Sequence, residues 1–158
     1  MRMMKLFLLL AICWTCPIFG EELLTENGKS DYWIVLDSST NAAERTAAQE
    51  LQNYIKQISK AELPITDKKK PHGKNILLGQ SSDVKQLLSD VDFKTLKTDE
   101  IMIRTIGTNL ILSGDRSRGT LYAVYTFLED YLGVRWWTPN VTDLPHSPTI
   151  RLPEINFR

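Results

Sequence analysis

The sequence predicts an α/β (α+β) fold in which two long helices cover a mixed β-sheet. Two long helical stripes of apolar residues alternate with short runs of apolar, largely β-branched residues, and one stretch alternates strictly, as a hairpin strand does. Elements with one apolar face must bury it against another layer, so this pattern favours a sandwich. A chain of 158 residues, 42% hydrophobic and 24% charged, can build one such core.

The first strand and the first long helix are close neighbours in the chain. Tyr32 to Leu36 form a near-continuous apolar run, which is typical of a strand buried on both faces. Asn41 and Glu44 have the spacing of a capping box, which predicts a helix from about Ala42 to Lys60. The apolar stripe of this helix repeats at spacings of three and four residues: Ala43, Ala47, Leu51, Tyr54, Ile55 and Ile58.

Short elements are expected between the two long helices. Pro64 has no backbone N–H, so its strand should lie at a sheet edge or begin there. Ser81 or Ser82 suits the N-cap of a short helix. The strands expected in this part are residues 63–65, 75–79, 100–106 and 110–112, the last two forming a hairpin.

A second long helix is expected from Gly119 to Leu132, with Gly133 just beyond its C-terminus. Its predicted buried stripe is Leu121, Val124, Tyr125, Leu128 and Leu132. An extended segment at residues 134–137 follows, and a last strand is expected at residues 149–152. These elements complete a layered α/β order with no internal repeat.

Residues 1–20 have the pattern of a signal peptide. Arg2 and Lys5 precede an apolar run that is too short to span a bilayer, and Gly20 suits a cleavage site. We therefore expect an exported protein, periplasmic or extracellular, without a membrane span. Lipidation at Cys13 or Cys16 is the alternative for this segment. Basic and acidic side chains balance, so charge gives no reason to expect nucleic acid as a partner.

Two segments contain candidate binding residues. The loop from Gly114 to Thr120 follows a strand and opens a helix, but it lacks the lysine of a phosphate-binding loop, so its glycines are interpreted as a tight turn. Its arginines would be solvated or would pair with a neighbouring domain. The second segment contains adjacent tryptophans, which in a strand face opposite ways and would pack internally, meet another domain or contact a sugar. The candidate residues are Arg116, Arg118, Arg135, Trp136 and Trp137.

Catalytic and metal-binding patterns are missing from the sequence. His72 and His146 lie in proline-containing loops without ligand spacing, so neither a metal nor another cofactor is expected. Glu129 and Asp130 are adjacent on a helix and diverge around its axis, so they cannot flank one glycosidic bond. No catalytic residue is therefore predicted.

Several segments, taken in their order along the chain, form a recognisable set. They are Ala47-Ala48-Gln49-Glu50-Leu51-Gln52-Asn53-Tyr54-Ile55, Ala61-Glu62-Leu63-Pro64-Ile65, Asn75-Ile76-Leu77-Leu78-Gly79 and the helix from Gly119 followed by Gly133-Val134-Arg135-Trp136-Trp137, which is the most specific part. Together they resemble the N-terminal domain of α-glucuronidases of glycoside hydrolase family 67, over about Tyr32 to Pro153. This domain is similar in fold to the second domain of β-N-acetylhexosaminidases.

The resemblance implies a non-catalytic accessory domain of a secreted glycoside hydrolase, because in these families the catalytic acids lie in a (β/α)-barrel that follows this domain. The expected division is a signal peptide at 1–20, a flexible lead-in at 21–31, the domain at 32–153 and the start of a linker at 154–158, with the barrel missing. The expected partner is carbohydrate or such a barrel, which a separate chain could supply. The alternative is a stand-alone carbohydrate-binding module that uses Trp136 or Trp137.

Overall fold

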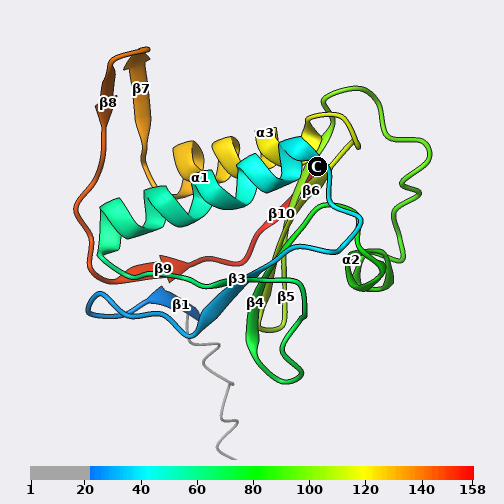
Figure 1. Ribbon diagram of the computed structural model, residues 1–158, viewed down its shortest axis with the longest axis horizontal. Helices are drawn as coiled ribbons and strands as arrows, with labels where there is room; N and C mark the ends of the chain where they lie inside the picture. The colour runs from blue at the N-terminus through cyan, green and yellow to red at the C-terminus, as the bar shows by residue number, and fades with distance from the viewer. Residues whose placement is uncertain (1–21) are drawn as a thin grey trace, which may run out of the picture.

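A computed structural model describes residues 22–158, so the predicted signal peptide lies outside the described residues (Figure 1). Within this part of the chain the main element is a six-stranded sheet in the order β10-β5-β6-β4-β2-β3. The central strands β2, β4 and β6 and the edge strand β3 are parallel, whereas β5 and β10 are antiparallel to their neighbours. The strands are β2 (Tyr32–Val35), β3 (Ile65–Thr66), β4 (Lys74–Leu78), β5 (Ile101–Ile106), β6 (Asn109–Gly114) and β10 (Asn156–Phe157). The predicted mixed sheet, hairpin and edge position of the Pro64 segment are confirmed.

Helices cover both faces of this sheet. On one face α1 (Ala42–Ser59) packs against α3 (Gly119–Thr126), and the larger core lies beneath them. On the other face α2 (Ser82–Leu87) and the chain after it cover a smaller core. Alternation along each strand divides the sheet between the two cores: Ile76 and Leu78 belong to the larger one, and Leu77 belongs to the smaller. The predicted α/β sandwich is therefore confirmed.

The predicted capping box at the start of α1 is present. The Asn41 side-chain oxygen accepts a hydrogen bond from the Glu44 backbone N–H at 2.9 Å, and the Glu44 carboxylate accepts one from the Asn41 backbone N–H at 2.9 Å. These bonds satisfy donors that the first helical turn leaves free. The cap of α2 is Ser81, the first of the two serines considered.

The second long helix differs in its geometry from the prediction. After α3 the chain continues as a π-helix, η1 (Phe127–Tyr131), before the left-handed Gly133 ends it. Of the predicted stripe, Val124, Leu128 and Leu132 are buried. Ala123 and Phe127 are also fully buried, whereas Leu121 and Tyr125, expected in the stripe, are only half-buried, so the buried face of α3 is turned from the predicted one.

Both ends of the described chain form strands where the sequence analysis expects a lead-in and a linker. β1 (Glu22–Thr25) pairs antiparallel with β9 (Ile150–Leu152), and β10 pairs with β5. Leu24 is completely buried, which gives this first segment a place in the larger core. Part of the expected lead-in, residues 22–25, thus forms β1, which is too short to show a strand period in the sequence. The predicted strand at 149–152 corresponds to β9.

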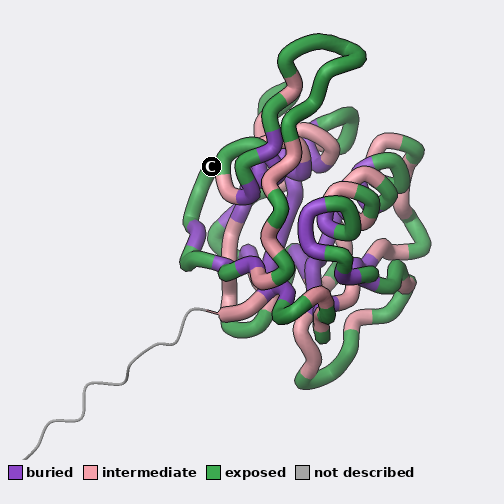
Figure 2. Tube along the Cα trace, turned by 90° about the vertical axis from the view of Figure 1, so that its left-hand side faces the viewer, coloured by how far each residue is buried: buried purple, intermediate pink, exposed green. Residues whose placement is uncertain are grey.

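A two-stranded ribbon projects from the body above α1 and the helix that follows α3 (Figures 1 and 2). It consists of β7 (Arg135–Thr138) and β8 (Val141–Asp143), which pair antiparallel with an irregularity between Trp136 and Thr138. Every residue of the ribbon except Trp136 is exposed. Among residues 22–158, no helix combines the length and apolar character needed to cross a membrane.

Candidate functional site

The 114–120 loop is a tight turn between β6 and α3, as its glycines predict. A Cβ atom on Gly114 would lie 2.4 Å from the Glu100 carbonyl oxygen and 2.6 Å from the Gly119 carbonyl carbon. A Cβ atom on Gly119 would likewise lie 2.8 Å from the Gly114 carbonyl carbon. The two glycines are therefore needed because backbone segments touch there.

The charged groups of this loop form hydrogen bonds and an ion pair with the loop itself and with Asp99, just before β5. The Asp115 carboxylate accepts hydrogen bonds from the Ser117 backbone N–H at 2.9 Å and the Asp99 backbone N–H at 3.0 Å. Burial opposes ionisation of Asp115, but these bonds and the Ser117 hydroxyl outweigh it, so its pKa is lowered. The Arg118 guanidinium lies 3.2 Å from the Asp99 carboxylate and 5.5 Å from the centre of the Tyr122 ring. Arg118 thus stabilises the loop itself.

Beside this loop lies a groove of about 630 Å³ at the ends of β4 and β6, which we call the strand-end groove. The Arg116 side chain is exposed at this groove, while its backbone carbonyl accepts a 2.7 Å hydrogen bond from the Asn41 side-chain amide. The acids of the groove, Asp92 and Asp115, both accept hydrogen bonds from loop backbone N–H groups. Both carboxylates therefore act as hydrogen-bond acceptors that hold the backbone around them.

The base of the β7–β8 ribbon is held by aromatic contacts with both helices beneath it. The Trp136 indole Nε1–H donates to the Tyr54 hydroxyl of α1 at 2.8 Å. The Trp136 ring meets Tyr54 and Tyr125 edge-on, with centroid separations of 5.5 Å and 5.4 Å. Tyr125 in turn donates to Glu50 at 3.3 Å, and burial, with the Glu50 charge, raises the pKa of Tyr125 to about 12. Trp136 is therefore an anchor.

The neighbouring Trp137 has the opposite environment. Its side chain is 64% exposed, and its indole Nε1–H donates across the ribbon to an Asp143 carboxylate oxygen at 2.9 Å. Trp137 lies at the irregularity in the strand pairing, which is a place where β-bulges redirect side chains. Arg135 turns back to the body, donating to the Glu129 carbonyl oxygen at 2.6 Å and its neighbour Val134 at 2.9 Å. The prediction that one tryptophan faces inward and the other outward is confirmed.

The five candidate residues fall into two separate groups. Arg116 and Arg118 precede α3, whereas Arg135, Trp136 and Trp137 follow η1. Sequence reasoning missed the partners Tyr125 and Asp143 as site residues; the Pro139-Asn140 turn was the available signal for a strand that returns to Asp143.

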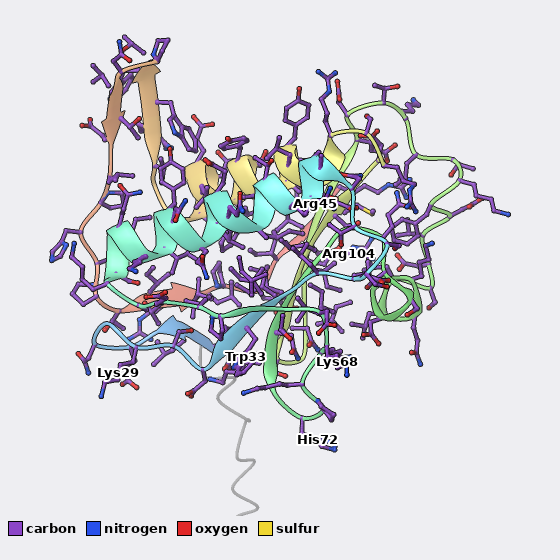
Figure 3. All side chains as sticks on the ribbon, viewed as in Figure 1. Lys29, Trp33, Arg45, Lys68, His72 and Arg104 are labelled. Atoms are coloured by element: carbon purple, nitrogen blue, oxygen red, sulfur yellow. The ribbon has the colours of Figure 1, made fainter. Side chains whose placement is uncertain are left out.

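His72, which the sequence analysis set aside as a metal ligand, belongs to the loop between β3 and β4, on the side of the molecule away from the ribbon (Figure 3). In the described chain, no three or more His, Cys, Asp or Glu side chains gather in a way that could hold a metal ion.

Comparisons with known proteins give a family for the sequence and solved structures with a similar fold. Residues 19–127 match the family described as the glycosyl hydrolase family 67 N-terminus. A solved GH115 4-O-methyl-α-glucuronidase, BtGH115A, with specificity for decorated arabinogalactans, is similar with a TM-score of 0.66 and 23% identity over 85% of this chain. This chain spans 18% of that enzyme's length, so the likeness concerns the fold of one part of it.

A second solved structure, a GH138 enzyme targeting pectin rhamnogalacturonan II, aligns with 63% of this chain and 13% of its own length, at 16% identity and a TM-score of 0.45. No curated protein matches the sequence.

Proposed function

Because the chain belongs to the family of glycosyl hydrolase family 67 N-terminal domains, we propose that it is a non-catalytic accessory domain of a secreted glycoside hydrolase. The family match covers α1, α3 and every strand of the main sheet except β10. These elements bury two apolar cores. The domain would support and orient a catalytic partner.

The family match carries the proposal, and the pKa directions of the carboxyl groups agree with it. Glycoside hydrolysis needs two carboxyl groups about 5–10 Å apart in a cleft, one of them with a raised pKa so that it can donate a proton. In the described chain, each carboxyl group whose pKa is shifted has it lowered: Asp37, Asp90, Glu100 and Asp115. Such groups are poor general acids near neutral pH.

The catalytic groups would come from a partner with a (β/α)-barrel, in the same polypeptide or in a separate chain. Interfaces between domains of one enzyme are more polar than those of permanent dimers. Large hydrophobic residues exposed in the described chain are few: Ile65 and Phe157 on the edge strands of the main sheet, and Trp137 and Val141 together on the ribbon. This surface suits a polar interface of that kind. Export to the periplasm or outside the cell rests on the signal-peptide pattern of residues 1–20.

The test combines activity and export. The purified protein is incubated with glucuronoxylan oligosaccharides and aryl glycosides, and released sugar is measured against an active family 67 α-glucuronidase. We expect no release by this chain alone.

Separately, cells expressing the full sequence are fractionated, and the mature protein is expected outside the cytoplasm with Glu21 as its first residue. Release of sugar by this chain alone would overturn the non-catalytic role. A protein that stays in the cytoplasm with residues 1–20 still attached would overturn export.

A further inference from the structure

The β7–β8 ribbon combines an exposed aromatic ring with an unusually fixed position. Trp137 is 64% exposed, although tryptophan is a side chain that folding normally buries to a large extent. Its indole N–H is already bonded to Asp143 at 2.9 Å, so the ring cannot rotate freely. The base of the ribbon is fixed as well, because Trp136 bonds Tyr54 and packs on Tyr125. The ring is therefore held in place before any partner arrives, which lowers the entropic cost of binding.

The Asp143 carboxylate is the polar group bonded to Trp137, whereas Thr142 pairs in register with Trp136. The ribbon presents the hydroxyls of Thr138 and Thr142, the Asn140 amide and the Asp143 carboxylate, all exposed. The second Asp143 oxygen takes part in no hydrogen bond among residues 22–158, so it remains an acceptor. Val141 is the other large apolar side chain exposed on the ribbon. One exposed indole and one valine on the ribbon are a smaller apolar surface than the patches of several hundred Å² that mark extensive protein contacts.

These features match the chemistry of a neutral sugar. A pyranose ring has an apolar C–H face, which can stack on an indole, and hydroxyl groups, which need donors and acceptors at the edge of that indole. A polyanion would require several unpaired cations, and the one arginine of the ribbon, Arg135, turns back to the Glu129 carbonyl. We propose that Trp137 and Asp143 form a glycan-binding site, with Trp137 stacking on a pyranose face and Asp143 accepting a sugar hydroxyl.

In this site Asp143 has a second task as a positioning residue, because it holds the indole. The two tasks can be separated by substitution. Asp143→Asn keeps an oxygen that can accept the Trp137 N–H, whereas Asp143→Ala removes it. Both variants keep the Trp137 ring, but only Asp143→Ala removes the hydrogen bond that holds it in place.

The test is a calorimetric titration of the purified protein, without any catalytic partner, with xylohexaose, chitohexaose and an arabinogalactan oligosaccharide. We expect weak binding of at least one of them, and a loss of about tenfold in affinity for Trp137→Ala, the factor that about 1.4 kcal/mol produces. Asp143→Ala should weaken binding more than Asp143→Asn does. Phe157→Ala is the matched control, because it removes another exposed aromatic ring, on β10 at the edge of the main sheet. This variant should bind as the unchanged protein does.

Two outcomes would overturn the glycan site. If none of the oligosaccharides binds, Trp137 is exposed for another reason, such as contact with a partner protein. If Trp137→Ala binds as tightly as the unchanged protein, the sugar site lies elsewhere. Neither result bears on the non-catalytic role, which depends on hydrolysis and is measured separately.

Discussion

The two segments that flank α3 and η1 have opposite characters. In the 114–120 loop, which enters α3, polar groups bond the loop and the segment before β5: Asp115 accepts from the Ser117 and Asp99 backbone N–H groups, and Arg118 pairs with Asp99. In the β7–β8 ribbon, which follows η1, Trp136 is bonded inside while Trp137 is presented to solvent. The difference gives the polar groups of the loop a structural role, and the ribbon is the segment where we propose recognition.

The largest expected effect compares the adjacent tryptophans. Trp136→Ala should lower the free energy of unfolding by about 3 kcal/mol, because it removes packing on two tyrosines and a hydrogen bond to Tyr54. Trp137→Ala should change it by less than about 0.5 kcal/mol, as an exposed substitution does. Urea denaturation measures both. Equal losses of unfolding free energy in the two variants would mean that Trp136 contributes no more to stability than the exposed Trp137.

The second prediction concerns the turn of the loop. Gly114→Ala should cost about 2 kcal/mol, since its new methyl group would collide with the backbone of Glu100 and Gly119. Gly107 is the control: it has a φ of 58° but open space around it, so Gly107→Ala should cost only about 1 kcal/mol from backbone strain. A smaller loss for Gly114→Ala than for Gly107→Ala would contradict the contact between the loop backbones.

The third prediction tests the link between the loop and α1. Asn41 caps α1 and also donates to the Arg116 carbonyl, so Asn41→Ala should destabilise the fold by about 1 kcal/mol. Asn53→Ala, at an exposed position within the same helix, should leave the stability nearly unchanged. Thermal unfolding of both variants would show the difference, and similar melting temperatures would argue against a role for the cap.

The smallest effect should depend on pH. Because the pKa of Asp115 is lowered in the folded protein, its charge stabilises the fold above its unfolded pKa of about 3.9, and this contribution disappears as the pH falls through the folded value. Asp115→Asn should therefore lower the unfolding free energy at pH near 7 and have no additional effect in strong acid. A difference from the unchanged protein that stayed constant over this range would exclude the charge as its cause.

Much of the fold could be predicted from the sequence because its signals are local. The capping box of Asn41 and Glu44 places the start of α1, and the apolar runs at Tyr32 and Asn75 place two central strands. The short strands β1 and β10 could not be found in this way, because pairing with β9 and β5 defines them. The π-helix was also missed, since its hydrogen bonds leave no residue pattern in the sequence.

The candidate site was predicted only in part. Period-2 alternation correctly separates Trp136 from Trp137, but it cannot say which of them faces the body. That depends on Tyr54 and Tyr125, which come from helices far apart in the chain. Asp143 becomes a partner of Trp137 only through the pairing of β7 with β8. Contacts of this kind depend on tertiary structure.

One nuclear magnetic resonance titration tests most directly whether recognition belongs to the ribbon and not to the loop. The ¹⁵N-labelled protein is titrated with the oligosaccharide that binds best, and the Trp137 indole resonance is assigned from its absence in Trp137→Phe. The account predicts that this resonance shifts with sugar while those of the Trp136 indole and of the Arg116 and Ser117 amides stay in place. Shifts at Arg116 and Ser117, with the Trp137 resonance unmoved, would contradict it and place recognition at the strand-end groove.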